Sequence, residues 1–80
     1  MKLGICGSGQ LSMMLCQASK KLNIETIVLS DSEYGPAKNY CDEYFFCNYN
    51  DEVKLKEFAK KIDVATLEFE NISFKVLKQI

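Results

Sequence analysis

The feature that most constrains the fold is a short, largely apolar run that opens into a glycine turn. Leu3-Gly4-Ile5-Cys6 leads into Gly7-Ser8-Gly9, and a helical pattern starts at once. Glycines let the backbone turn tightly and let a ligand approach without a Cβ in the way. A helix that starts at such a turn presents backbone N–H groups and the positive end of its dipole, which suits a phosphate or another anion. The alternative is a turn that only connects a strand to a helix.

The rest of the chain continues the alternation of strand and helix. Apolar and β-branched runs predict strands, and apolar residues at helical spacing predict helices. The expected strands are residues 2–6, 25–29, 43–47 and 64–69, the helices are 10–22 and 51–62, and a third helix follows an N-cap at Ser73. Residues 30–39 read as a loop with a short helical turn. Right-handed crossovers then give an α/β, Rossmann-like domain: about four parallel strands in order 3-2-1-4, with helices on both faces.

Both main helices carry an apolar stripe that we expect to face the sheet. Asn23 is a plausible end for the first helix, and Asn50 or Asp51 is expected to cap the second. The stripes consist of Leu11, Met14, Leu15, Ala18 and Leu22 in the first helix, and of Leu55, Phe58, Ala59 and Ile62 in the second.

The last predicted strand becomes acidic toward its carboxyl end. Because side chains alternate along a strand, Thr66, Glu68 and Glu70 share one face. Polar groups at the end of an inner strand are costly unless they face a cleft or a partner. The functional interpretation is a carboxylate that accepts a hydrogen bond from a ligand, and the alternative is a solvated strand end. In a parallel sheet this end lies beside the glycine turn, where ligands bind.

Composition narrows the possible functions. The 80 residues form one domain at most, and a net charge of −1 argues against a nucleic-acid-binding face. No apolar run approaches the ~20 residues of a membrane span, and the N-terminus does not resemble a signal peptide. The four cysteines form no C-x-x-C pair and there is no histidine, so we expect free thiols, no metal site and a cytoplasmic location.

Two motifs together resemble a known enzyme family. Gly7-Ser8-Gly9-Gln10-Leu11 and the stretch from Asp63 to Asn71, Asp-Val-Ala-Thr-Leu-Glu-Phe-Glu-Asn, are similar to the N-terminal domain of the ATPase subunit of phosphoribosylaminoimidazole carboxylase. This enzyme is also called 5-(carboxyamino)imidazole ribonucleotide synthase. Gly35-Pro36-Ala37 and Asp42 also fit the loop that follows the second strand in this family. The resemblance covers residues 1–80 and implies a pre-ATP-grasp domain of the ATP-grasp superfamily.

The resemblance implies a ligase of de novo purine biosynthesis. In such enzymes ATP activates bicarbonate, and the carboxyl group passes to the exocyclic amine of aminoimidazole ribonucleotide. Carried over by position, the expected substrate-binding residues are Gly7, Gly9, Gln10, Leu11 and Glu70. Two positions depart from the family pattern: Ser12 starts Ser-Met-Met where Gly-Arg-Met is common, and Ser73 stands where a proline is frequent.

The resemblance also implies what lies outside these residues. The lysines that hold ATP and the acids that hold Mg²⁺ would belong to an ATP-grasp domain and not to residues 1–80. We therefore expect no catalytic residue here and an inactive fragment. The expected partners are the ribonucleotide, bicarbonate and the missing ATP-grasp domain, with a homodimer as an open possibility.

Two other functions stay open from the residues alone. Gly7, Gly9 and Asp31 fit a nicotinamide-dinucleotide module, although Ser12 replaces the third glycine of that fingerprint. A non-catalytic interaction domain is the other alternative, with apolar surface expected around Phe74, Leu77 and Ile80.

Overall fold

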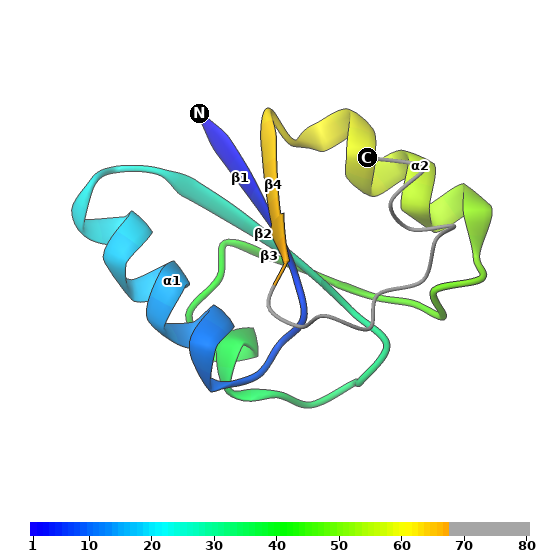
Figure 1. Cartoon of the computed structure of the whole chain (residues 1–80), viewed down its shortest axis with the longest axis horizontal. Helices are drawn as coiled ribbons and strands as arrows, with labels where there is room; N and C mark the ends of the chain where they lie inside the picture. The colour runs from blue at the N-terminus through cyan, green and yellow to red at the C-terminus, as the bar shows by residue number, and fades with distance from the viewer. Residues whose placement is uncertain (68–80) are drawn as a thin grey trace.

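The computed structural model describes residues 1–67, and the fold is a parallel sheet between two helical layers (Figure 1). The four strands lie in the order β3-β2-β1-β4, and each neighbouring pair is parallel. The predicted fold class and strand order are therefore confirmed. In chain order the elements are β1 (Lys2–Cys6), α1 (Gln10–Lys21), β2 (Glu25–Ser30), the 3₁₀ helix η1 (Pro36–Asn39), β3 (Glu43–Phe46), α2 (Glu52–Lys61) and β4 (Val64–Leu67).

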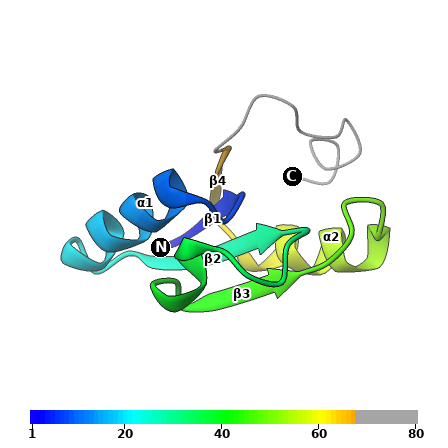
Figure 2. The same cartoon turned by 90° about the horizontal axis from the view of Figure 1, so that it is seen from below.

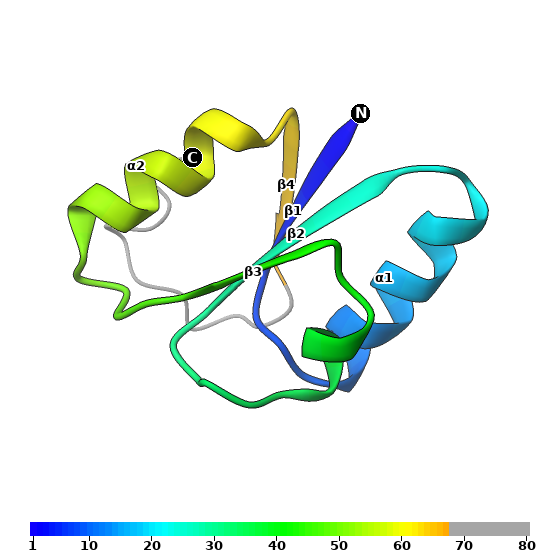
Figure 3. The ribbon, with the colours of Figure 1, turned by 180° about the vertical axis from the view of Figure 1, so that it is seen from behind.

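The two helical layers lie on opposite faces of the sheet, as right-handed crossovers require (Figures 2 and 3). α1 and η1 share one face, and α2 covers the other. The expected helical turn within residues 30–39 is η1. The predicted end of β4 at residue 69 and the helix after Ser73 lie outside the described residues. Among residues 1–67, no helix is long and apolar enough to cross a membrane.

The helix boundaries follow from local chemistry. Asp51 caps α2, because its Oδ1 accepts a hydrogen bond from the Lys54 backbone N–H at 3.1 Å. Asn23, two residues after α1, has a φ of 58°, a left-handed conformation that ends helices. Both signals were predicted from the residue types, and both are confirmed.

The core under α2 follows the predicted stripe. Leu55 and Phe58 are buried, and Ile62 packs against the same cluster. Phe45 meets Phe58 edge to face, with ring centroids 5.9 Å apart. The buried members of this cluster are Cys6, Ile27, Leu29, Cys47, Leu55 and Phe58.

The predicted inward stripe of α1 is wrong. The buried row of the helix is Ser12, Cys16 and Ser19, while Leu11 and Met14 are 50% and 54% exposed. Leu22 and Ala18 are also exposed, and Leu15 is half-buried. Small side chains in the buried row let α1 lie close to the sheet, where Cys16 packs with Ile5, Val28 and Ala37. The larger apolar side chains are displaced to the flank of the helix.

Candidate functional site

The glycine turn lies at the carboxyl edge of the sheet, between β1 and α1. Gly7 has a φ of 115°, which side-chain-bearing residues rarely adopt, so the turn depends on glycine here. The Gly7 N–H donates to the Leu29 carbonyl at 2.8 Å. This bond extends the pairing of β1 and β2 by one residue and fixes the direction in which the turn leaves the sheet.

A pair of buried hydroxyls ties the turn to the end of β2. Ser8 Oγ lies 2.9 Å from Ser30 Oγ, although 22 residues separate them in the chain. Ser30 Oγ also accepts a hydrogen bond from the Ser32 backbone N–H at 3.0 Å. Because both hydroxyls are buried, the bond between them satisfies groups that would otherwise be costly to bury.

The loop after β2 packs directly on the same turn. The Ala37 N–H donates to the Ser8 carbonyl at 3.1 Å. Gly35 has an extended backbone, and a Cβ added there would overlap both the Oγ and the carbonyl oxygen of Ser8. We call this contact between Ser8 and residues 35–37 the seam. Sequence reasoning assigned Gly35-Pro36-Ala37 to the family's loop but did not predict the contact, because nothing local pairs Ser8 with residues so distant.

α1 begins where this turn ends. Its N-cap is Gly9, which has no side chain to cap the helix, and its first turn carries no acidic residue. The Met13 N–H donates to the Gly9 carbonyl at 3.0 Å, which closes the first turn. Gln10 and Leu11 are exposed at this end. A glycine cap and a positive dipole end suit an anionic ligand.

β4 runs toward the same edge of the sheet. β4 pairs with β1 in parallel register, with Thr66 opposite Ile5 and Leu67 opposite Cys6, the residue before Gly7. The strand of the second motif therefore runs beside the strand that leads into the glycine turn, whereas the acidic end of that motif lies outside the described residues. Glu70 itself lies outside the described residues, so its side chain is not placed against the turn.

Cys6 is buried near this edge, and Tyr49 is partly buried against the same core cluster. Burial raises the pKa of the Cys6 thiol to about 12, and the nearby Cys47 thiol adds to the shift. Burial also raises the pKa of the Tyr49 hydroxyl, as does the charge of Asp31. All four cysteines are free. Raised pKa values leave these thiols poor nucleophiles, which favours structural roles over catalysis.

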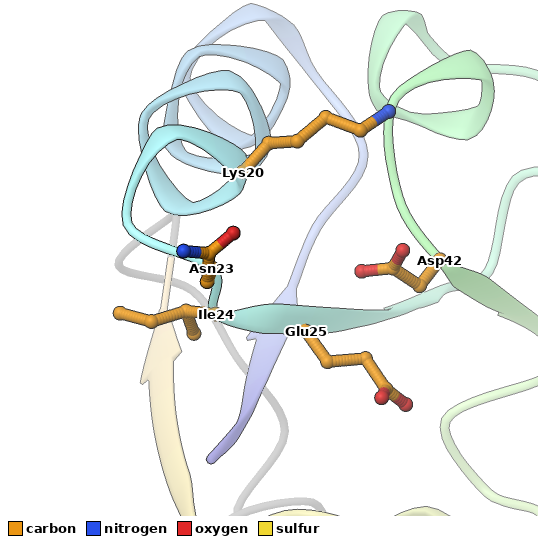
Figure 4. A pocket seen from close by; sticks show the side chains of 5 residues that line it. All are labelled: Lys20, Asn23, Ile24, Glu25 and Asp42. Atoms are coloured by element: carbon orange, nitrogen blue, oxygen red, sulfur yellow. The ribbon is translucent and has the colours of Figure 1, made fainter.

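A hollow lies at the opposite, amino-terminal edge of the sheet (Figure 4). Its volume is about 260 Å³, and its lining combines a lysine with two carboxylates. The Asp42 carboxylate already accepts a hydrogen bond from the Thr26 backbone N–H at 2.7 Å, so it secures the start of β2. The lining residues are Lys20, Asn23, Ile24, Glu25 and Asp42. Within residues 1–67, no group of three or more His, Cys, Asp or Glu side chains could hold a metal ion.

Comparison with known proteins defines the class of domain. The model of the ribonucleotide synthetase preATP-grasp domain matches residues 1–80. The chain belongs to this family. The match favours the first of the three functions considered from the sequence over the nicotinamide and interaction modules.

Several similar proteins share one name. N5-carboxyaminoimidazole ribonucleotide synthase of Staphylococcus aureus is 41% identical over 76 residues, which are 95% of this chain and 20% of the relative. A crystal structure of the Staphylococcus aureus enzyme complexed with ADP superposes with a TM-score of 0.87 at 40% identity, over 96% of this chain and 21% of that one. The crystal structure of the Thermotoga maritima synthetase superposes with a TM-score of 0.85 at 33% identity, over 98% of this chain and 22% of that one. The chain thus spans about a fifth of the length of these relatives.

Proposed function

We propose that residues 1–80 are the substrate-side module of an ATP-dependent ligase that carboxylates aminoimidazole ribonucleotide in de novo purine biosynthesis. The reaction uses ATP and bicarbonate and releases ADP and phosphate. The observation that carries the proposal is the family match together with a helix that starts from a glycine turn at the carboxyl edge of the sheet. The relative crystallised with ADP supports the use of ATP.

In this proposal residues of this module bind and orient the ribonucleotide. The turn from Gly7 to Gly9 allows a close approach of the phosphate or ribose to the backbone. Gln10 offers its amide to the substrate, Leu11 contacts it, and Glu70 accepts a hydrogen bond from a substrate N–H or hydroxyl. ATP and Mg²⁺ bind to the ATP-grasp domain of the intact enzyme. The 80-residue fragment alone is inactive, and the intact enzyme acts in the cytoplasm.

An amide NMR titration of the 80-residue chain with aminoimidazole ribonucleotide tests the site. We expect shifts confined to residues 7–11 and to the neighbourhood of Glu70, and weaker binding in Glu70→Ala. Glu25→Ala is the matched control, because it removes a carboxylate at the start of β2, at the edge of the sheet opposite to the glycine turn. Shifts that follow a nicotinamide dinucleotide instead, or equal losses in the two variants, would contradict the assignment.

Activity provides a second test. The purified 80-residue chain should form no product from ATP, bicarbonate and aminoimidazole ribonucleotide, whereas the intact protein should. ATP-dependent product from the 80-residue chain alone would refute the proposal that this module is inactive without the ATP-grasp domain. A homodimer stays a prediction, to be tested by sedimentation equilibrium of the intact protein.

A further inference from the structure

An aspartate stands immediately before each of the two outer strands of the described sheet, and both make the same pair of hydrogen bonds. Asp63 precedes β4: its backbone N–H donates to the Lys2 carbonyl at 2.8 Å, and its Oδ2 accepts from the Lys2 backbone N–H at 2.7 Å. Asp42 precedes β3: its backbone N–H donates to the Thr26 carbonyl at 3.0 Å, and its Oδ2 accepts from the Thr26 backbone N–H at 2.7 Å. We call these arrangements the Asp63 clamp and the Asp42 clamp.

The two clamps hold equivalent positions in the sheet. The first residue pairs of the two ladders are Leu3 with Val64 and Ile27 with Glu43, so each aspartate lies one step before the first pair of its ladder. Its carboxylate occupies the place of the main-chain carbonyl that one more rung of a parallel ladder would supply. Each clamp therefore adds a rung where the chain enters the outer strand, and this rung fixes which residues stand opposite one another.

The side chains of β4 do little to fix its register. Val64 is 49% exposed, and Ala65 and Thr66 are only partly buried. A strand whose two faces are both weakly buried is prone to slip, and a slip by one residue turns every side chain to the opposite face. The Asp63 clamp opposes this slip, because both of its hydrogen bonds join the same residue, Lys2, and a shifted β4 would lose them.

The register decides which side chains of the β4 segment face α1. Thr66 is opposite Ile5, which packs with Cys16 of α1, so Thr66 lies on the face that α1 covers. α1 begins at the glycine turn, and the alternation expected from the sequence places Glu70 on the face of Thr66. We infer that Asp63 is a positioning residue, which holds β4 in the register that directs Glu70 toward the bound ribonucleotide. The inference rests on the proposed function, in which Glu70 accepts a hydrogen bond from that substrate.

Steady-state kinetics of the intact protein provide the test, with Asp42→Ala as the matched control. Asp63→Ala should raise the KM for aminoimidazole ribonucleotide about fivefold, the effect of losing one ordinary hydrogen bond, and should leave the KM for ATP unchanged. Asp42→Ala breaks the equivalent clamp at β3, a strand that carries no proposed substrate-binding residue, so both KM values should stay unchanged. Equal increases in the two alanine variants would overturn the inference.

Two further variants ask how Asp63 acts. Asp63→Asn keeps a side-chain oxygen that can accept from the Lys2 backbone N–H, so its KM for the ribonucleotide should lie near that of the unsubstituted protein. In a Glu70→Ala background, Asp63→Ala should change this KM by less than about twofold, because the group that the clamp positions is gone. A further fivefold increase in that background would show that Asp63 does not act through Glu70, and it would overturn the inference.

Hydrogen exchange of the intact protein, followed by mass spectrometry, measures the clamps without turnover. Peptides that contain β1 should exchange faster in Asp63→Ala, and peptides that contain β2 should exchange faster in Asp42→Ala. Unchanged exchange in β1 would refute the Asp63 clamp. Faster exchange in β1 with an unchanged KM would overturn the positioning role and leave the proposed function standing. An unsubstituted protein that turns over no aminoimidazole ribonucleotide would instead refute the proposed function, and the exchange of β1 would then test the clamp alone.

Discussion

Gly35→Ala is the substitution with the most calculable effect on the seam. The backbone of Gly35 is extended, with a φ of −168°, so alanine adds no backbone strain. The added Cβ would lie 2.5 Å from the Ser8 carbonyl oxygen and 2.7 Å from Ser8 Cβ. Ordinary contact begins near 3.4 Å, so the loop must retreat by nearly 1 Å. That movement stretches the 3.1 Å hydrogen bond from the Ala37 N–H to the same carbonyl beyond bonding distance.

The expected cost combines overpacking with the loss of one hydrogen bond. Overpacking of this kind costs about 1–3 kcal/mol, and a lost hydrogen bond about 1 kcal/mol. We expect relief by loop movement to keep the total near 2 kcal/mol, which lowers the melting temperature by roughly 8–16 °C in a domain of this size. Urea unfolding and thermal melts of the 80-residue chain, followed by circular dichroism, measure both quantities.

Ser8→Gly provides the internal check on this reasoning. It removes the Oγ and Cβ atoms that the new methyl group would strike, but it leaves the carbonyl oxygen in place. The double variant should therefore cost about 1 kcal/mol less than the sum of the single variants. Glu33→Ala, at an exposed position of the same loop, should change stability by less than about 0.5 kcal/mol. Simple additivity, or a Gly35→Ala effect no larger than that control, would refute the steric account.

Three further predictions concern other parts of the fold. Gly7→Ala should cost about 2 kcal/mol in urea unfolding, because its φ of 115° is strained for any residue with a Cβ. Asp51→Ala should cost about 1 kcal/mol through loss of the α2 cap, while Asp51→Asn should retain most of the stability. The third prediction is a loss of stability between pH 9 and pH 12. The Cys6 thiol has a pKa of about 12 when folded against 9.0 when exposed, so the unfolded chain ionises first. The contribution of Cys6 to stability should fall by up to about 1.4 kcal/mol per pH unit in this range, and Cys6→Ala should remove that part of the slope.

The strand order and the second helix were predictable because each depends on local patterns. Four apolar runs separated by helical segments allow few right-handed parallel topologies, and the observed order is the one expected. In α2 the largest side chains, Leu55 and Phe58, also face the sheet, so hydrophobic periodicity and burial coincide.

In α1 periodicity and burial diverge. Its buried row of serines and a cysteine has little hydrophobic signal, yet these small side chains allow close packing on Ile5 and Val28. The apolar stripe that the sequence predicts lies largely on an exposed side of α1 instead. A periodic apolar stripe therefore predicts a buried helix face, but it does not say whether the sheet of the same module buries that face.

The seam and the neighbouring Ser8–Ser30 bond were beyond prediction for a related reason. Local patterns located the glycine turn and the loop separately, and the family resemblance grouped them, but the Ser8–Ser30 bond joins residues that only the folded sheet brings together. Small residues make these contacts, and small residues contribute little to any hydrophobic pattern.

These features make α1 the element that carries the proposed substrate site. Its first turn starts at the glycine turn and contains Gln10 and Leu11, two of the predicted substrate-binding residues. The Gly7–Leu29 bond and the seam hold the start of the helix against the sheet. The position of this turn relative to the sheet is therefore set by contacts within the domain itself. A ribonucleotide that binds as proposed meets a turn that needs no rearrangement, and such preorganisation favours reaction.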